Sequence, residues 1–149
     1  MNPNKIDSLI RRYEDIFVFA NRKIHALFAE QLSDDITAEQ FFTLRLIKER
    51  GPCTSSLLSE WNCVNRSATT AMVDRLVAKG YVTRQPDSQD RRVILLQATE
   101  DAEQVLQAGQ ENLRQFVRTY LDELEEEELE SFISVYERIW NIIQEKEGK

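Results

Sequence analysis

The fold is decided by residues 65–99, which read NRSATTAMVDRLVAK followed by GYVTRQPDSQDRRVILLQAT. In the first part, apolar residues return at steps of three and four, which predicts an amphipathic helix. This spacing places Ala68, Met72, Val73 and Leu76 on one side and Ser67, Thr70, Ala71 and Asp74 roughly opposite. Gly80 follows the last periodic residues and is expected to end the helix in a left-handed conformation, because glycine has no Cβ to clash.

The outer side of this predicted helix is flat and carries hydroxyl groups. Short side chains let a helix backbone lie close to base edges in a DNA groove, and hydroxyls can bond to bases or phosphates. Each position could instead be an ordinary exposed residue. We interpret Asn65 chiefly as the helix cap at the start of this site. The remaining assignments are base or groove contact for Ser67, Thr70 and Ala71, and phosphate contact for Arg66 and Thr69.

Two β-rich runs follow, at residues 81–85 and 92–97, and they flank a polar segment that contains Pro86, Asp87 and Ser88. This pattern predicts a hairpin with a polar tip. Arg91 lies at or near the tip, where an arginine could enter a minor groove and its concentrated negative potential. Arg84 could reach a phosphate or simply project from its strand.

Residues 79–92 form the ordered pattern KGYVxRxxDxxDRR, which is followed by an apolar strand and Thr99. This pattern resembles the wing of the multiple-antibiotic-resistance regulator (MarR) family of bacterial transcription factors, and VDRL at residues 73–76 resembles the end of that family's recognition helix. The resemblance implies a sequence-specific DNA-binding regulator, usually a repressor. It also implies that ion pairs of Asp90 and Arg92 hold the wing against the recognition helix, with Arg75 as a partner for Asp90.

The segments around this stretch predict a mainly α fold with one small β-hairpin wing (α+β). Thr37 and Gln40 have the spacing of a capping box, and Thr54 can cap a short helix, which together with the helix at 65–79 forms a helix-turn-helix. We predict one domain, residues 1–149, with a winged helix-turn-helix at 37–98. Long amphipathic helices at 6–32 and 99–147 form a dimerisation region, because their apolar faces are too long for the winged part to cover. The alternative is a self-contained monomeric bundle.

The charge distribution is uneven. The chain carries a net charge of −7, whereas residues 61–97 hold six cations and three anions, a net +3. An acidic body with one basic face suits a protein that presents that face to phosphate. Residues 122–130 hold much of the acidity, and we interpret them as the solvated start of a helix, where the helix dipole favours acids.

The resemblance further implies a small, often aromatic or phenolic effector, bound in a cleft between the dimer helices and the winged part. The candidate lining residues are His25, Phe28, Phe41, Phe42 and Arg45. A single histidine argues against a metal site, and no cofactor is expected. The peroxide-sensing branch of the family uses a cysteine in the N-terminal helix, which this chain lacks. Cys63 could act as a redox switch, but a packed, inert thiol is the preferred interpretation.

The motifs that are present and absent separate three function classes: an enzyme, a DNA-binding regulator and a protein-interaction module. No phosphate-binding glycine loop, nucleophile elbow or metal motif is present in the sequence, and one histidine is little for acid–base chemistry, so an enzyme is not expected. The sequence shows neither a secretory leader nor a long apolar run, so we expect a cytoplasmic protein without membrane contact. The leading prediction is a homodimer on a double-stranded DNA operator. The alternative is a winged-helix module that binds a protein partner.

Overall fold

The computed structural model describes residues 2–148. The chain divides into two compact units, which we call the winged unit (Met1–Leu113) and the C-terminal unit (Arg114–Lys149). The elements of the winged unit are α1 (Pro3–Gln31), α2 (Ala38–Arg50), α3 (Ser55–Asn62), α4 (Arg66–Ala78), β1 (Val82–Pro86) and β2 (Ile94–Ala98). Helix α5 (Glu100–Leu121) runs from this unit into the C-terminal one, which also holds α6 (Glu126–Glu147).

Side-chain caps begin the three helices of the helix-turn-helix segment. The Thr37 hydroxyl accepts the Gln40 N–H at 3.2 Å, and the Gln40 side chain accepts the Thr37 N–H at 3.2 Å, so the predicted capping box is confirmed. Thr54 and Asn65 likewise accept backbone N–H groups three residues on. Each cap satisfies an amide that the first helical turn leaves without a partner.

Gly80 ends α4 as predicted. Its φ of +79° is in the left-handed region. The N–H groups of Gly80 and Tyr81 return to the carbonyls of Val77 and Leu76, both at 3.0 Å. This pair of bonds is the Schellman arrangement, which satisfies the last carbonyls of the helix and turns the chain sharply. The wing therefore leaves α4 at a fixed corner.

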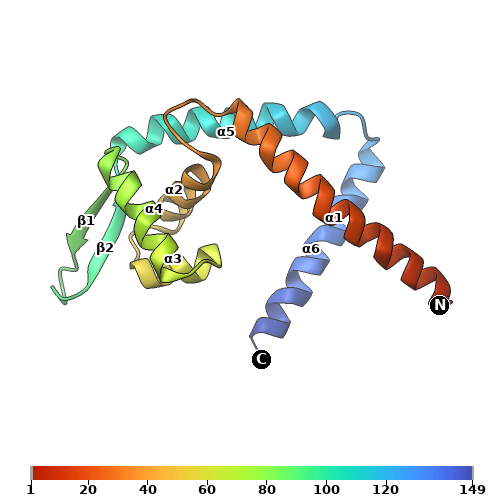
Figure 1. Cartoon of the computed structure of the whole chain (residues 1–149), viewed down its shortest axis with the longest axis horizontal. Helices are drawn as coiled ribbons and strands as arrows, with labels where there is room; N and C mark the ends of the chain where they lie inside the picture. The colour runs from red at the N-terminus through yellow and green to blue at the C-terminus, as the bar shows by residue number, and fades with distance from the viewer. Residues whose placement is uncertain (1, 149) are drawn as a thin grey trace. The chain divides into compact units, whose positions relative to one another are not determined.

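The two strands of the wing pair antiparallel, from Val82 opposite Ala98 at the base to Pro86 opposite Ile94 near the tip. Figure 1 shows this hairpin beside α4, whose C-terminal end is followed by the start of β1. The Thr99 hydroxyl closes the base by donating to the Gly80 carbonyl at 2.7 Å. Cys53 pairs with Leu96 on the other side of β2 and ties the hairpin to the segment between α2 and α3.

The core of the winged unit lies among α2, α3, α4 and β2. Its fully buried side chains include Phe41, Leu44, Leu58 and Leu76. Helix α5 packs closely on this core, because a Cβ added at Gly109 would lie 2.7 Å from Cδ2 of Phe41. Phe28, from α1, makes an edge-to-face contact with Phe41, with ring centroids 5.8 Å apart, and so attaches the end of α1 to α2.

The apolar residues of α1 before Phe28 and those of α6 have a different environment. Phe19 and Trp140 are 69% and 58% exposed, and no residue of α6 is buried. The acidic run does begin a helix as predicted, with three glutamates in the first turn of α6 and the Glu128 side chain accepting the Glu125 N–H. Within residues 2–148, no helix is both long and apolar enough to cross a membrane.

Candidate nucleic-acid interface

The outward face of α4 carries most of the residues predicted to contact DNA. Arg66, Ser67, Thr70 and Ala71 are exposed, as is Asn65 before the helix. The Thr70 hydroxyl donates to the Arg66 carbonyl at 2.9 Å, so its oxygen lone pairs remain available as acceptors. This face is short-chained and lies near the N-terminal end of the helix, where backbone dipoles favour an anion.

Thr69 does not belong to that face. It is only 2% exposed, and its hydroxyl lies 2.9 Å from Ser59 Oγ and 3.1 Å from the Asn65 carbonyl oxygen. The prediction that Thr69 contacts a phosphate is therefore wrong. The buried stripe of α4 is Thr69, Val73 and Leu76. Ala68, placed on the buried side by the sequence pattern, is exposed.

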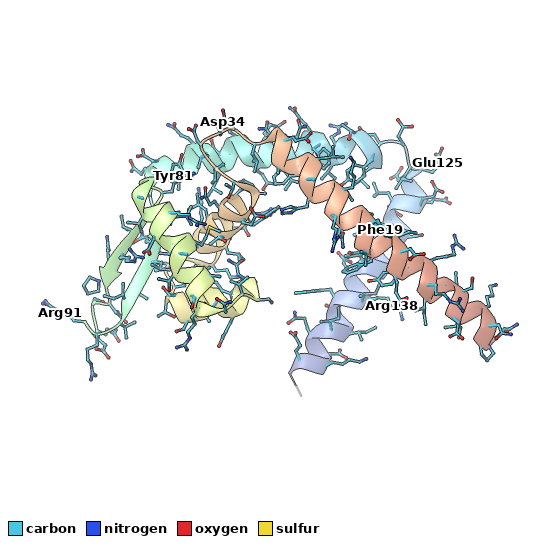
Figure 2. All side chains as sticks on the ribbon, viewed as in Figure 1. Phe19, Asp34, Tyr81, Arg91, Glu125 and Arg138 are labelled. Atoms are coloured by element: carbon cyan, nitrogen blue, oxygen red, sulfur yellow. The ribbon has the colours of Figure 1, made fainter. Side chains whose placement is uncertain are left out.

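The wing tip is organised by two aspartates that fold the chain back on itself. The Asp87 carboxylate accepts the Gln89 N–H, and Asp90 accepts the Arg92 N–H at 3.1 Å. Asp90 also accepts the Arg92 guanidinium at 3.2 Å, and these hydrogen bonds from the side chain and backbone of Arg92 lower the pKa of the Asp90 carboxyl. Figure 2 shows Arg91 at the tip, directed away from the protein.

The ion pairs between wing and helix differ from the predicted ones. Asp90 pairs with Arg92 inside the tip and not with Arg75. The pair that joins the wing to α4 is Arg84 with Asp74. The turn at Gly80 brings these two together across ten residues of chain. Arg84 thus has a protein partner, which the sequence interpretation missed. The available signal was an aspartate on the outer face of the predicted helix, ten residues before Arg84 and separated from it by the turn at Gly80.

The remaining cations of this surface have no such partner. Arg66, Arg75 and Arg91 are exposed, and the side chains of the described residues offer them no ion pair within 4.0 Å. We call the exposed face of α4 and the wing tip together the basic surface; it consists of Asn65, Arg66, Ser67, Thr70, Ala71, Asp74, Arg75, Arg84, Asp90, Arg91 and Arg92. Free guanidinium groups on it can bind phosphate as bidentate donors.

The predicted effector residues do not gather in one place. His25 and Phe42 line a pocket of about 360 Å³, which α4 closes with Ala68 and Met72. Phe41 and Arg45 border a different hollow, of about 370 Å³, between α2 and α5. Phe28 is buried and borders neither of these two pockets, so its place in a cleft lining stays a prediction.

A hydrogen bond between two ionisable side chains lies at the first pocket. His25 Nε2 lies 3.1 Å from Glu39 Oε1, which connects α1 to α2. A hydrogen bond from its own backbone N–H, followed by the bond from His25, lowers the pKa of Glu39. The pocket therefore combines an apolar wall, made by Phe42 and Met72, with one charged rim.

The two cysteines are free and occupy opposite environments. Cys53 is buried, and burial raises the pKa of its thiol. Cys63 is exposed and caps α3 in the left-handed region, with φ of 55°. The expectation that Cys63 is a packed thiol is thus wrong. Its Sγ lies 3.7 Å from the Glu60 carbonyl oxygen, so the thiol has only a weak backbone contact.

The arrangement of α3, α4 and the β1–β2 hairpin defines a winged helix-turn-helix. Comparisons with known proteins agree with it. The family model described as "MarR family" matches residues 36–94. The HTH-type transcriptional regulator YpoP of Bacillus subtilis is 30% identical over 110 residues, which cover 74% of this chain and 78% of that protein. The HTH-type transcriptional repressor MdtR of the same organism is 33% identical over 94 residues, covering 63% of this chain and 61% of MdtR.

A solved structure extends the likeness to the three-dimensional level. A mutant of MarR from Escherichia coli, crystallised in complex with operator DNA, superposes with a TM-score of 0.73 at 28% identity. The match covers 91% of this chain and 96% of that one. The chain belongs to the MarR family of winged helix-turn-helix transcriptional regulators. Members of this family are regulators and not enzymes, which confirms the prediction of a non-enzymatic protein.

Proposed function

We propose that this regulator binds a pseudo-palindromic operator as a homodimer and represses transcription in the bacterial cytoplasm. The observation that carries the proposal is the basic surface: the exposed residues of α4 carry hydroxyl groups, the hairpin lies beside α4 (Figure 1), and Arg91 lies at its tip (Figure 2). In this arrangement α4 would lie in a major groove, and Arg91 would reach the adjacent minor groove. The relationship to MdtR, a repressor, supports the sign of regulation.

The exposed apolar residues support the homodimer. The α1 set is Leu9, Ile10, Tyr13, Ile16, Phe17, Val18, Phe19 and Ile24, and the α6 set is Phe132, Ile133, Val135, Tyr136, Trp140, Ile142 and Ile143. So many large apolar side chains exposed on a soluble chain indicate an interface, because burial of apolar surface is the main favourable term in association. A second copy covers them by two-fold symmetry. It also supplies a second basic surface for a half-site roughly 34 Å away.

Selection of bound sequences from random duplex DNA tests this proposal directly. We expect a palindromic consensus with half-sites about one helical turn apart. Affinity for it should fall with salt, with a slope of about −0.9 per phosphate neutralised. Recovery of no consensus, or salt-independent binding, would favour the alternative of a protein-interaction module. Repression is then tested by transcription in vitro from a promoter that overlaps the selected site.

We further propose that the pocket beside α4 takes a small aromatic or phenolic effector. Phe42, Val64 and Met72 offer apolar contacts to a ring, and the His25–Glu39 pair offers a polar group at the rim. Because Ala68 and Met72 belong to α4, a ligand that fills the pocket can shift the recognition helix against α2. Such a ligand would change DNA affinity only by as much as it prefers one helix position over the other.

The effector proposal is tested with a panel of small phenols in the DNA-binding assay. For each compound, affinity with and without ligand is compared in wild type and in Met72→Phe, which reduces the volume of the pocket. We expect a compound that changes wild-type affinity to lose its effect in the variant. Arg45→Ala, at the other hollow, is the control and should respond as wild type does. A response lost in Arg45→Ala and kept in Met72→Phe would move the site to the pocket between α2 and α5.

A further inference from the structure

The ion pair of Asp74 and Arg84 places a carboxylate on the surface that is proposed to meet phosphates. Asp74 lies on the exposed face of α4, and Arg84 lies on β1 opposite Leu96. Their side chains are 60% and 39% exposed. An exposed ion pair contributes little to folding stability, so stability alone does not explain an acid at this position.

The same pair controls what Arg84 can reach. While Asp74 holds the guanidinium, Arg84 is neutralised and is directed toward the helix. Without Asp74 it would be a free cation in the middle of β1, able to contact the phosphates of any sequence. Phosphate contacts carry no sequence information of their own. A freed Arg84 would therefore raise affinity for all duplexes alike.

We propose that Asp74 is a selectivity residue, which binds Arg84, withholds it from phosphates and fixes the wing against α4. The inference rests on the proposed DNA binding. It makes Arg84 a positioning residue and leaves Arg66, Arg75 and Arg91 as the free cations of the basic surface. The pair thus weakens nonspecific binding to phosphates, and it fixes the angle between α4 and the hairpin, the two elements proposed to contact DNA.

The test measures affinity for the selected operator and for a scrambled duplex over a series of salt concentrations. In Asp74→Asn we expect about tenfold tighter binding to the scrambled duplex, a smaller change on the operator, and a salt slope steeper by about 0.9. In Arg84→Gln we expect weaker operator binding with the salt slope unchanged. In the double variant the salt slope should return to the wild-type value, because Arg84, the arginine that the loss of Asp74 would free, is itself absent.

The chain contains a matched control pair within α2. Arg45 and Glu49 form an exposed ion pair with side chains 38% and 57% exposed, nearly the same as Arg84 and Asp74. Glu49→Gln and Arg45→Gln make the same changes in charge and should leave the ratio of operator to scrambled affinity unchanged. Thermal unfolding followed by circular dichroism verifies that every variant folds.

Three results would overturn the inference. A slope reduced by about 0.9 in Arg84→Gln would show that Arg84 already contacts a phosphate. A gain in scrambled affinity that persists in the double variant would assign the effect to the charge of Asp74 alone. An unchanged selectivity ratio in Asp74→Asn, with wild-type binding intact, would refute this inference but not the proposed function. Wild-type protein that binds no duplex would refute the proposed function itself.

Discussion

The helix-turn-helix core and the long helices contain similar apolar residues, but these residues are buried in the core and exposed on the long helices. Leu44, Leu58 and Leu76 are fully buried by contacts within the winged unit, whereas Ile16 of α1 and Trp140 of α6 are 62% and 58% exposed. The change occurs even within α1, since Phe28 near its end is only 2% exposed. The comparison shows that contacts within a single chain bury the apolar side chains of the winged segment. The long helices need apolar cover from elsewhere, which the proposed second copy would provide.

The largest effect should come from a charge placed on α6. If a partner covers Trp140, truncating the indole alone costs about 3–5 kcal/mol, and a buried carboxylate adds to this cost. Trp140→Glu should therefore convert the dimer to monomer, as measured by sedimentation equilibrium. Gln144→Glu adds the same charge to the same helix and should disturb assembly less. A Trp140→Glu protein that still sediments as a dimer would remove α6 from the interface.

The next effect tests the core that lies within one chain. Leu76→Ala removes a fully buried side chain of α4 and should lower the free energy of unfolding by about 2–5 kcal/mol. Urea unfolding at fixed protein concentration measures this change. Val77→Ala, one position further along and only half-buried, should cost less. Equal costs at the two positions would contradict the observed orientation of α4.

A smaller effect is expected at the wing tip. Arg91→Ala should weaken operator binding by roughly 1–3 kcal/mol if the guanidinium enters a groove. The unfolding free energy should scarcely change, because Arg91 is exposed and its side chain has no hydrogen bond or ion pair among residues 2–148. Arg11→Ala, an exposed cation on α1, is the control for net charge. Unchanged affinity in a folded Arg91→Ala protein would exclude Arg91 from the interface.

The smallest effect concerns the contact between α1 and α2. Because the pKa of Glu39 is lowered in the folded protein, its contribution to stability is present above the unfolded pKa near 4.5 and is lost as pH falls through the folded value. The pair is largely exposed, so Glu39→Gln should cost less than about 1 kcal/mol at pH 7. Urea unfolding of both proteins from pH 7 to pH 3 should show the difference disappearing. A difference independent of pH would mean that the charge of Glu39 is not involved.

Local features of the fold could be predicted from sequence because each depends on neighbouring residues. The caps at Thr37, Thr54 and Asn65 and the left-handed Gly80 are set within four or five positions of chain, and all four are confirmed. The family was also recognisable, since the pattern of residues 79–92 is long and ordered.

The errors concern contacts that helical periodicity does not determine. A 3.6-residue repeat fits two buried stripes on α4 almost equally well. One contains residues 68, 72 and 76, as predicted, and the other contains residues 69, 73 and 76, as observed. Thr69 can be buried because Ser59, on another helix, donates a hydrogen bond to its hydroxyl oxygen. Likewise Asp74 meets Arg84 only because the chain turns at Gly80.

The residues predicted to line one effector cleft lie in two different pockets for a related reason. Successive helical positions point about 100° apart, so Phe41 and Phe42 face different hollows, and Arg45 follows Phe41 one turn later. A list of aromatic and basic residues along α2 therefore mixes two sides of one helix. Only the packing of α4 and α5 on either side separates them.

The aspartate-organised wing tip has a thermodynamic consequence. Its backbone is already held by Asp87 and Asp90, so docking would immobilise the side chain of Arg91 without first having to order a loop. The entropic cost of that step is confined to a few rotatable bonds. Lengthening the tip with glycine would spread this cost over the backbone and should shorten the residence time on DNA.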